Sequence, residues 1–356
     1  MIDFLVIGGG IAGLSAGARL APHGEVVLLE KEDGLGYHAS GRSAALYEAQ
    51  YGKASTIALN LASRAFHQEG GYLSPRGLMV VGKAGDEAGF RQEVADAGLN
   101  VISVDEAIAM VPILNPETVA YAAWHEDAMD LDTDRMFQDF AREIRSHGGQ
   151  VLPKTTVEAI ARTPDGWEVT ANGTTYAARR LVNAAGPWAD TIAEMAGVPK
   201  IGIVPHRRSM ARIPAPGGHD MTGWPMIFSV GETWYCKPDA GKLLVSPAEE
   251  DAMEPHDAWA DDMVLAEGLA RYEEMMTEPV TRLETSWAGL RSFAPDRQLV
   301  LGPDPVDPAF VWSAGQGGYG FQTAPAASQL VADLTLGQPP ALADDIVAAL
   351  RPDRLR

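Results

Sequence analysis

Cysteine is nearly absent from this sequence, since Cys236 is the only one among 356 residues. No intramolecular disulfide can form, which fits a reducing compartment and predicts a cytoplasmic protein. Basic charge is also scarce, because 28 Lys and Arg residues stand against 48 Asp and Glu residues, a formal net charge of -20. This charge repels phosphate backbones and anionic lipid surfaces, so we expect neither nucleic-acid nor membrane-surface partners.

Long hydrophobic runs are missing as well. No stretch reaches the roughly 18 consecutive apolar residues that a membrane helix needs, so no integral membrane association is expected. The apolar opening MIDFLVIGGG has no basic residues before it and runs directly into glycines, which predicts a buried strand rather than a secretory signal. The eight histidines are scattered without metal-ligand spacing, and no metal site is predicted.

Apolar side chains make up 46% of the residues, enough to bury the core of more than one compact unit. The chain opens with an apolar strand, a helix of small and apolar residues that ends in glycine, and a second apolar strand. Together they predict a β-α-β unit. Helical spacing recurs in residues 55–68, where an amphipathic helix is predicted to carry its apolar face on Ile57, Leu61, Ala65 and Phe66.

The rest of the chain divides by composition. Turn dipeptides between short β-like runs in residues 157–186 predict a small antiparallel sheet, whereas residues 201–285 are rich in Pro, Trp and Met. Residues 310–337 return to strand, glycine turn and helix. We therefore predict an α/β fold, α+β overall, in which a Rossmann-type nucleotide-binding domain carries an inserted antiparallel-sheet substrate domain. The first domain is assigned to residues 1–72, 134–200 and 286–356, and the second to residues 73–133 and 201–285.

Glycines at the spacing of a dinucleotide-binding turn follow the first strand and open the first helix: Gly8, Gly10 and Gly13. At such a turn the bare backbone lets a pyrophosphate approach the positive N-terminus of the helix. Glu30 ends the next strand, where its carboxylate can accept both ribose hydroxyls of an adenosine. A second glycine turn precedes a helix that begins near Gln322, and it contains Gly315, Gly317, Gly318 and Gly320. Two separated turns suit one extended cofactor that runs from an adenine to a tricyclic ring.

Five motifs together carry a family resemblance: GGGIAGLSAGARLAPHG with VVLLEKE, GYHASGRSAA, LVNAAGPWAD, WAGLRSFAPDRQLVLGP and WSAGQGGYGFQT. They resemble the superfamily of FAD-dependent D-amino-acid oxidases and glycine oxidases, and within it the D-arginine dehydrogenase branch. The resemblance covers nearly the whole chain and implies an FAD-binding first domain. The FAD is expected to be non-covalent, because Cys236 lies away from the glycine-rich segments. The cofactor-binding residues that the resemblance implies are Gly8, Gly10, Ala12, Gly13, Glu30, Lys31, Ser40, Arg42, Ser43, Ala44, Val157, Gly186, Gly289, Gly315, Gly317, Gly318, Tyr319, Gly320, Gln322 and Thr323.

Two adjacent arginines stand in the extended run VPHRRSMARI, residues 204–213. Consecutive side chains of a strand point to opposite faces, so Arg207 and Arg208 cannot both enter one site. One is expected to face a ligand and the other to stay solvated, unless each pairs with a nearby acid. The resemblance selects Arg208, together with Arg291, as a clamp on a substrate carboxylate, which a guanidinium binds bidentately. It also implies catalytic-site roles for Tyr51 on a mobile loop, Tyr235 at the carboxylate, Gly318 at the substrate nitrogen and Gln322 nearby.

The activity that this resemblance implies is oxidative deamination of a D-amino acid by a dehydrogenase. A hydride would move from Cα to flavin N5, and the imine would hydrolyse to a 2-oxo acid and ammonia. The electron acceptor stays open. Two alternatives stay open as well: an oxidase of glycine or sarcosine type that makes H2O2, and a flavin-binding subunit of a larger complex.

Three positions depart from the D-arginine dehydrogenase pattern: Leu78 replaces a glutamate, Leu46 a histidine and Glu48 a threonine. The lost glutamate would have offset the desolvation of a cationic side chain, so a neutral or apolar D-amino acid is expected. Met226 and Phe228 join Leu78 as predicted walls of the side-chain pocket. The alternative is that Glu48 replaces the lost glutamate as a negative partner for a cationic side chain, from another direction.

Overall fold

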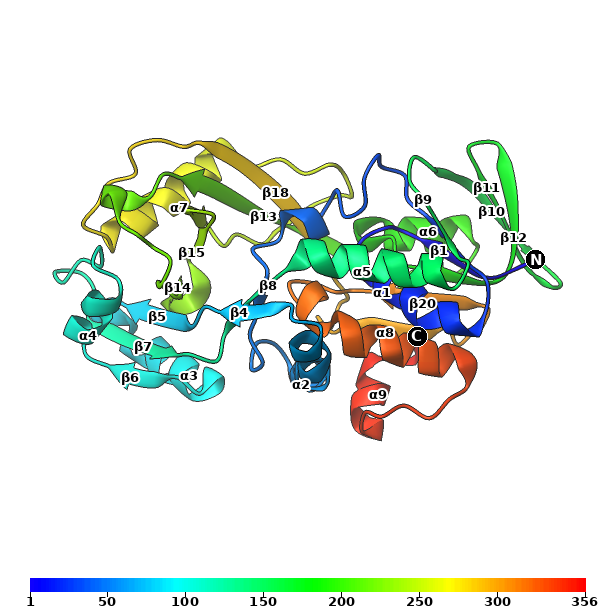
Figure 1. Ribbon diagram of the computed structural model, residues 1–356, viewed down its shortest axis with the longest axis horizontal. Coiled ribbons are helices and arrows are strands. Elements are labelled where there is room, and N and C mark those ends of the chain that lie inside the picture. Colours follow the sequence, from blue (N-terminus) through cyan, green and yellow to red (C-terminus); the bar gives the residue numbers. More distant parts are fainter.

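The computed structural model describes all 356 residues, which form two lobes (Figure 1). The first lobe holds both termini and is built on an eight-stranded sheet with the order β10-β11-β12-β1-β2-β9, to which β20 and β19 add beside β12. The second lobe is built on a nine-stranded sheet with the order β17-β13-β16-β15-β14-β5-β7-β6, and β18 pairs with β13. A three-stranded sheet, β3-β8-β4, lies between the lobes.

The strands of the first lobe are β1 (Ile2–Ile7), β2 (Val26–Leu29), β9 (Gln150–Leu152), β10 (Val157–Thr163), β11 (Gly166–Ala171), β12 (Thr174–Asn183), β19 (Val300–Pro303) and β20 (Phe310–Ala314). Its helices are α1 (Ile11–Leu20), α2 (Ala54–Glu69), α5 (Thr133–Ser146), α6 (Ala189–Met195), α8 (Gly320–Leu336) and α9 (Asp344–Leu350). None of the helices in the chain combines the length and the apolarity that crossing a bilayer requires.

The strands of the second lobe are β5 (Leu78–Gly82), β6 (Asn100–Ile102), β7 (Tyr121–His125), β13 (Val204–Ile213), β14 (Met226–Ser229), β15 (Tyr235–Asp239), β16 (Lys242–Ser246), β17 (Asp251–Ala252) and β18 (Thr285–Phe293). Its helices are α3 (Glu87–Ala97), α4 (Val104–Met110) and α7 (Asp262–Glu274). The sheet between the lobes is made of β3 (Leu46–Tyr47), β4 (Leu73–Pro75) and β8 (Met129–Leu131).

The central strand β1 is covered on both faces, as its apolar run from Phe4 to Ile7 predicts. Phe4 and Val6 pack with residues of α1, α5 and α8 on one face, whereas Leu5 and Ile7 pack with residues of α6 and β11 on the other. β1 pairs in parallel with β2 and β12, so the carboxyl ends of these strands meet at one edge of the sheet. A parallel sheet of this kind binds its ligands at that edge. The predicted α/β class with a Rossmann-like sheet is confirmed.

The predicted buried face of α2 is wrong. Leu61 is 49% exposed, whereas the polar side chains of Asn60, Ser63 and His67 are buried. The reason lies in α8, where Pro325 lacks an N–H and interrupts the backbone ladder of the helix. Ser63 Oγ accepts the Ala326 N–H at 3.1 Å, and His67 Nε2 lies 3.0 Å from the Gln322 carbonyl oxygen. The buried polar face of α2 therefore satisfies backbone groups that α8 leaves free.

The boundary assigned at residue 286 falls inside β18. This strand pairs with β13 from Val204↔Phe293 to Arg212↔Thr285, so residues 286–293 belong to the sheet of the second lobe. The assigned boundary therefore does not coincide with the end of this strand, which composition does not mark. The functional division into FAD-binding and substrate domains stays a prediction.

Asp296, between β18 and β19, ties the C-terminal segment to the first lobe. Its carboxylate accepts hydrogen bonds from Arg354 Nε at 2.6 Å and from the Gln298 backbone N–H at 3.1 Å. Burial alone would raise the pKa of Asp296, but these hydrogen bonds outweigh it and lower the pKa to about 2. A carboxyl pKa that is depressed in the folded state contributes stability above the unfolded value near 4, and this stability is lost as the pH falls towards 2.

Asp296→Asn is therefore expected to lower the free energy of unfolding at neutral pH by about 1 kcal/mol, after allowance for the solvent exposure of the pair. The difference from wild type should shrink as the pH falls from about 4 to 2, which urea unfolding at several pH values would measure. Asp353→Asn is the control, because Asp353 pairs only with the exposed Arg351 at 2.8 Å. An equal loss in both variants at every pH would contradict this account.

Candidate active site

The turn between β1 and α1 leaves no room for side chains. Gly8 has a φ of +110°, and a Cβ there would lie 2.4 Å from the Ala184 carbonyl oxygen. A Cβ on Gly13 would lie 1.9 Å from the Gly8 carbonyl oxygen, so the first turn of α1 can approach the strand only with glycine at this position. The helix thereby presents its free N–H groups at the carboxyl edge of the sheet, where they suit an anionic pyrophosphate.

Glu30 follows β2 directly and is only 8% exposed. Its Oε2 accepts the Gly9 N–H at 2.6 Å and its Oε1 accepts the Glu32 N–H at 2.8 Å. These bonds fix the carboxylate beside the glycine turn, and each oxygen keeps a lone pair for a ribose hydroxyl. The next side chain, Lys31, places its Nζ 3.6 Å from the ring centroid of Trp188.

A first cavity of about 280 Å³ opens beside this turn. His38 and Trp188, whose ring centroids lie 4.8 Å apart, form part of its wall together with Pro187. Neither Pro187 nor Trp188 was predicted to bind the cofactor, although they are the two residues after the predicted Gly186. The predicted cofactor residues that line the first cavity are Gly8, Gly10, Glu30, Lys31, Ser40, Val157 and Gly186.

A second cavity of about 110 Å³ shares Ala39 and Ser40 with the first. The second glycine turn borders it, and a Cβ on Gly317 would lie 2.3 Å from the Phe293 ring. Turns from opposite ends of the chain therefore border one series of cavities. The predicted cofactor residues that line the second cavity are Ser40, Arg42, Ser43, Ala44, Gly289, Gly317, Gly318, Gly320 and Gln322.

A third cavity of about 300 Å³ continues from the second into the second lobe. The two cavities share Arg208, Tyr235, Arg291, Gly318 and Gln322, which are five of the six predicted catalytic-site residues. The sixth, Tyr51, lines the third cavity alone. The structure thus brings all six together, although they come from five separate segments of the chain.

The two predicted clamp arginines lie on neighbouring strands. β13 and β18 pair antiparallel with Arg208 opposite Gly289 and Arg291 opposite His206, a register that puts both arginines on one face at diagonal positions. Arg208 is 8% exposed, and its Nη2 donates to Glu250 Oε1 at 3.1 Å. Its Nε and Nη1 are buried without any partner.

Arg291 has no hydrogen bond or ion pair with any protein group, although it lines both the second and the third cavity. Burial alone would lower its pKa, but the tyrosine and carboxylate oxygens around it outweigh burial and raise the pKa. Its guanidinium packs against Gly318, where a Cβ would lie 3.2 Å from Arg291 Cζ. The site therefore holds a permanent positive charge that the protein leaves unpaired.

Arg207 points to the opposite face of β13, as predicted, but the expectation that it is solvated is wrong. Its side chain is 11% exposed, and its Nη2 lies 2.8 Å from Asp251 Oδ2. Glu249 and Asp261 approach the same guanidinium at 3.7 and 3.9 Å. Asp251 lies opposite Arg207 on the paired strand β17, Glu249 comes just before that strand, and Asp261 caps the start of α7. Arg207 is thus an internal ion-pair partner, whereas Arg208 and Arg291 face the cavities.

Two tyrosines stand near the arginines. Tyr235 is 3% exposed, and its ring centroid lies 5.2 Å from that of Phe228. Tyr51 comes from the loop between β3 and α2, and its hydroxyl donates to Glu232 Oε2 at 3.4 Å. Burial raises the pKa of Tyr51, so the phenol keeps its proton and acts as a donor. The contact with Glu232 places the loop of Tyr51 at the third cavity.

The side-chain part of the third cavity has the predicted apolar walls. Leu46, Leu78, Met226 and Phe228 line it together with Val80. Three carboxylates that were not predicted also line it: Glu93, Asp96 and Glu232. No sequence motif marks them, because they come from α3 and from the turn after β14.

Glu48 lines the same cavity but is already engaged by the protein. It is 6% exposed, its Oε1 accepts the Gln50 N–H at 3.0 Å, and its Oε2 lies 3.0 Å from His125 Nε2. His125 Nδ1 accepts the Asp127 N–H at 3.1 Å, which leaves the imidazole proton on Nε2, facing Glu48. One oxygen of Glu48 is thus hydrogen-bonded, and the other lies at ion-pair distance from His125, which the sequence did not mark, although these two atoms do not form a hydrogen bond.

Five predicted cofactor residues line none of the three cavities: Ala12, Gly13, Gly315, Tyr319 and Thr323. Thr323 is fully buried, and its Oγ1 donates to the Tyr319 carbonyl oxygen at 2.8 Å. Gly315 has a φ of +74°, a left-handed conformation that turns the chain after β20. These residues shape the two glycine turns, and their direct contact with a cofactor stays a prediction.

A Rossmann-like sheet edge, two glycine turns and a line of cavities that ends at two arginines are typical of an oxidoreductase that uses an extended dinucleotide. Comparison with known proteins identifies the family to which the chain belongs. Residues 3–334 match the DAO family, described as FAD dependent oxidoreductase. The chain belongs to this family, and FAD is its cofactor.

Similar proteins agree with this assignment. The glycine oxidase of Bacillus licheniformis is 24% identical over 95% of this chain and 94% of its own length. The FAD-dependent oxidoreductase domain-containing protein 1 of Mus musculus is 24% identical over 94% of this chain and 81% of its own length. The crystal structure of glycine oxidase from Geobacillus kaustophilus has the same fold, with a TM-score of 0.84, 23% identity and 98% of each chain covered. Membership of the D-arginine dehydrogenase branch stays a prediction.

Proposed function

We propose that this protein is a dehydrogenase that oxidises a D-amino acid with a neutral side chain to its imine, which water hydrolyses to a 2-oxo acid and ammonia. The observation that carries the proposal is the unpaired Arg291 beside Arg208, where the second and third cavities meet. Buried cations are normally paired within a protein. An unpaired one at a cavity therefore indicates an anionic ligand, and a carboxylate fits the planar donors of a guanidinium.

Different residues of the site would hold different groups of such a substrate. Arg208 and Arg291 would bind the carboxylate, with Tyr235 beside them. The carbonyl oxygen of Gly318 accepts no hydrogen bond from the protein, so it is free to accept one from the substrate amine. Fixing the carboxylate and the amine orients the Cα–H bond, and Tyr51 would cover the cavity against water. When bound, FAD supplies the acceptor for the hydride.

The side-chain preference rests on the walls of the third cavity. Leu46, Leu78, Val80, Met226 and Phe228 favour apolar groups. Glu48 is the one deeply buried acid there, and its carboxylate is already engaged by His125 and Gln50. A cationic side chain would therefore find no free partner among the buried acids, since Glu93, Asp96 and Glu232, which also line the cavity, are exposed or partly exposed. The D configuration and the choice of dehydrogenase rest on the motif resemblance.

An amino-acid oxidase of glycine or sarcosine type is the second candidate. The likeness to glycine oxidase over nearly the whole chain supports it. The volume of the third cavity, about 300 Å³, favours a substrate with a larger side chain than glycine or sarcosine carries. The carboxylate clamp would be the same in both.

Anaerobic bleaching of the bound flavin by D-, L- and N-methyl amino acids tests the proposal. We expect D-amino acids with neutral side chains to bleach the flavin fastest, and faster at alkaline than at neutral pH because the substrate amine must lose a proton first. Bleaching restricted to glycine and sarcosine, with stoichiometric H2O2 in air, would establish the second candidate instead. A yellow protein that no amino acid bleaches would indicate a flavin-binding subunit of a larger complex.

A further inference from the structure

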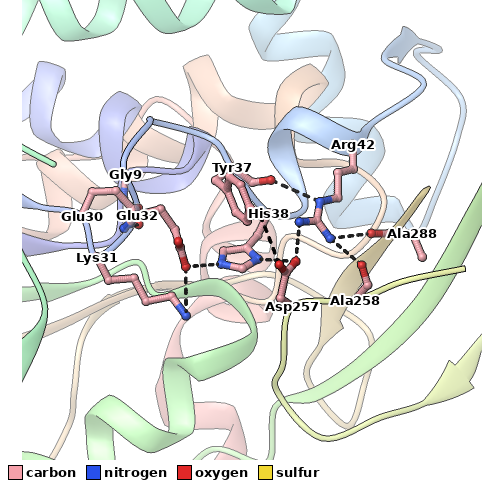
Figure 2. A network of polar contacts seen from close by, with 10 residues as sticks. All are labelled: Gly9, Glu30, Lys31, Glu32, Tyr37, His38, Arg42, Asp257, Ala258 and Ala288. Atoms are coloured by element: carbon pink, nitrogen blue, oxygen red, sulfur yellow. Dashed lines mark hydrogen bonds and ion pairs between the residues drawn. The ribbon is translucent and has the colours of Figure 1, made fainter. Parts of the chain in front are cut away.

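A segment of the second lobe reaches across to the loop that lines the FAD cavities. Residues 253–260 connect β17 to α7 without regular structure, and Figure 2 shows Asp257 and Ala258 of this segment beside Tyr37, His38 and Arg42. We call residues 253–260 the strap and residues 36–45 the cofactor loop. The cofactor loop lines the first cavity from Gly36 to Ser40 and the second cavity from Ala39 to Ala45. Contacts between the strap and this loop therefore bear on FAD.

The guanidinium of Arg42, in the cofactor loop, forms hydrogen bonds with other protein groups. Its Nη1 donates to the carbonyl oxygens of Ala258 at 2.7 Å and Ala288 at 2.8 Å, and its Nη2 donates to Asp257 Oδ1 at 2.5 Å. Its Nε donates to the Tyr37 carbonyl oxygen at 3.2 Å. All three guanidinium nitrogens are thus engaged. Arg42 lines the second cavity, yet its positive charge is directed to the strap and to β18.

Asp257 contacts several side chains of the cofactor loop. Besides Arg42, it accepts a hydrogen bond from the Tyr37 hydroxyl at 3.2 Å, and its Oδ1 lies 3.7 Å from His38 Nδ1. His38 continues the chain of contacts, because its Nε2 lies 2.9 Å from Glu32 Oε1 (Figure 2). The hydrogen bond from Arg42 lowers the pKa of Asp257, so the carboxylate stays ionised. Three side chains of the cofactor loop therefore meet at one carboxylate of the second lobe.

We propose that Asp257 is a positioning residue for FAD, which holds the cofactor loop against the bound cofactor through Arg42, Tyr37 and His38. The strap connects the second lobe to the cofactor loop, which lines both FAD cavities. Ala258 of the strap is 8% exposed and packs with Ala288 and Leu290, which fixes the strap in this position. The cofactor loop forms part of the wall of these cavities, so a loosened loop would hold FAD less firmly. Loss of Asp257 should therefore speed FAD release. The proposal needs FAD binding only and does not depend on the substrate.

The test is FAD release from the holoprotein of Asp257→Asn and Asp257→Ala, followed by the recovery of free-flavin fluorescence after dilution. We expect release to be about five- to tenfold faster than in wild type, the equivalent of about 1 to 1.4 kcal/mol. The wild-type rate should rise with salt, which screens a half-exposed ion pair, and the rate of Asp257→Asn should respond less.

Glu254→Gln is the matched control, because it removes another exposed charge from the same strap, one whose side chain has no hydrogen bond or ion pair with the cofactor loop, and its release rate should equal that of wild type. Tyr37→Phe removes only the 3.2 Å hydrogen bond, so it tests the same link if the Asp257 variants fold poorly. It should accelerate release by a smaller factor. Unchanged release in Asp257→Asn and Tyr37→Phe, or equal acceleration in Glu254→Gln, would overturn the proposal.

Discussion

Arg291→Met is expected to lower kcat/KM for the best amino-acid substrate by about 30- to 5,000-fold, with most of the change in KM. Removing one partner of a buried charge pair costs about 2 to 5 kcal/mol, which corresponds to that range. The guanidinium has no partner in the protein, so its removal leaves no protein carboxylate without a counter-charge. We therefore expect the free energy of unfolding to stay the same or to rise, because an unpaired and partly buried charge is removed.

Arg212→Met is the control for Arg291→Met. Arg212 lies on the same strand as Arg208, but its side chain is 44% exposed, approaches Glu284 at 3.7 Å and lines none of the three cavities. Steady-state kinetics and urea unfolding of both variants separate binding from folding. An unaltered KM in Arg291→Met would remove this arginine from the substrate clamp. A KM that rises equally in Arg212→Met would show a general effect of lost charge.

Gly13→Ala is expected to yield a colourless protein that takes up FAD poorly. The added Cβ would lie 1.9 Å from the Gly8 carbonyl oxygen, a distance that no change of rotamer can relieve, since the oxygen is a backbone atom and the backbone fixes the position of the Cβ. The start of α1 must move away from β1, which displaces the N–H groups offered to the pyrophosphate. We also expect a loss of about 3 kcal/mol or more in the free energy of unfolding of the apoprotein.

Gly34→Ala is the matched control for Gly13→Ala. Gly34 follows β2 in the same lobe, and a Cβ there would meet nothing within 4 Å. Flavin absorbance of the purified proteins and urea unfolding of the apoproteins measure both effects. A yellow Gly13→Ala protein of wild-type stability would show that close packing at this turn is not required. Loss of flavin in both variants would point to a general sensitivity of the lobe.

The sequence predicts the first lobe well because its signals are local. Gly8, Gly10 and Gly13 follow an apolar strand at fixed spacing, and the parallel sheet with its glycine turn forms as the pattern indicates. The face of α2 fails for the opposite reason. Its buried side is set by Pro325 in α8, more than 250 residues away, whose free backbone groups select Ser63 and His67 over Leu61. No hydrophobic pattern within α2 contains that information.

The predictions for the site show the same contrast between local signals and contacts of distant segments. Alternation along one strand separates Arg207 from Arg208, and the family motifs bring in Arg291 and Tyr51 from distant segments. What the sequence does not contain is the register of β13 against β18, which puts Arg208 diagonal to Arg291. It also does not show that Asp251 neutralises Arg207. The ion-pair contact of Glu48 with His125 likewise depends on contacts between separate elements, which the sequence does not show.

The central claim is that bound FAD faces a pocket where Arg208 and Arg291 hold a carboxylate. The most direct measurement is a titration of the oxidised holoprotein with benzoate, a carboxylate that cannot be dehydrogenated, while the visible absorption of the flavin is recorded. We predict a saturable spectral shift in wild type and in Arg212→Met, weakened at least about thirtyfold in Arg291→Met. A flavin spectrum that no carboxylate perturbs, or an equal shift in wild type and Arg291→Met, would contradict the account.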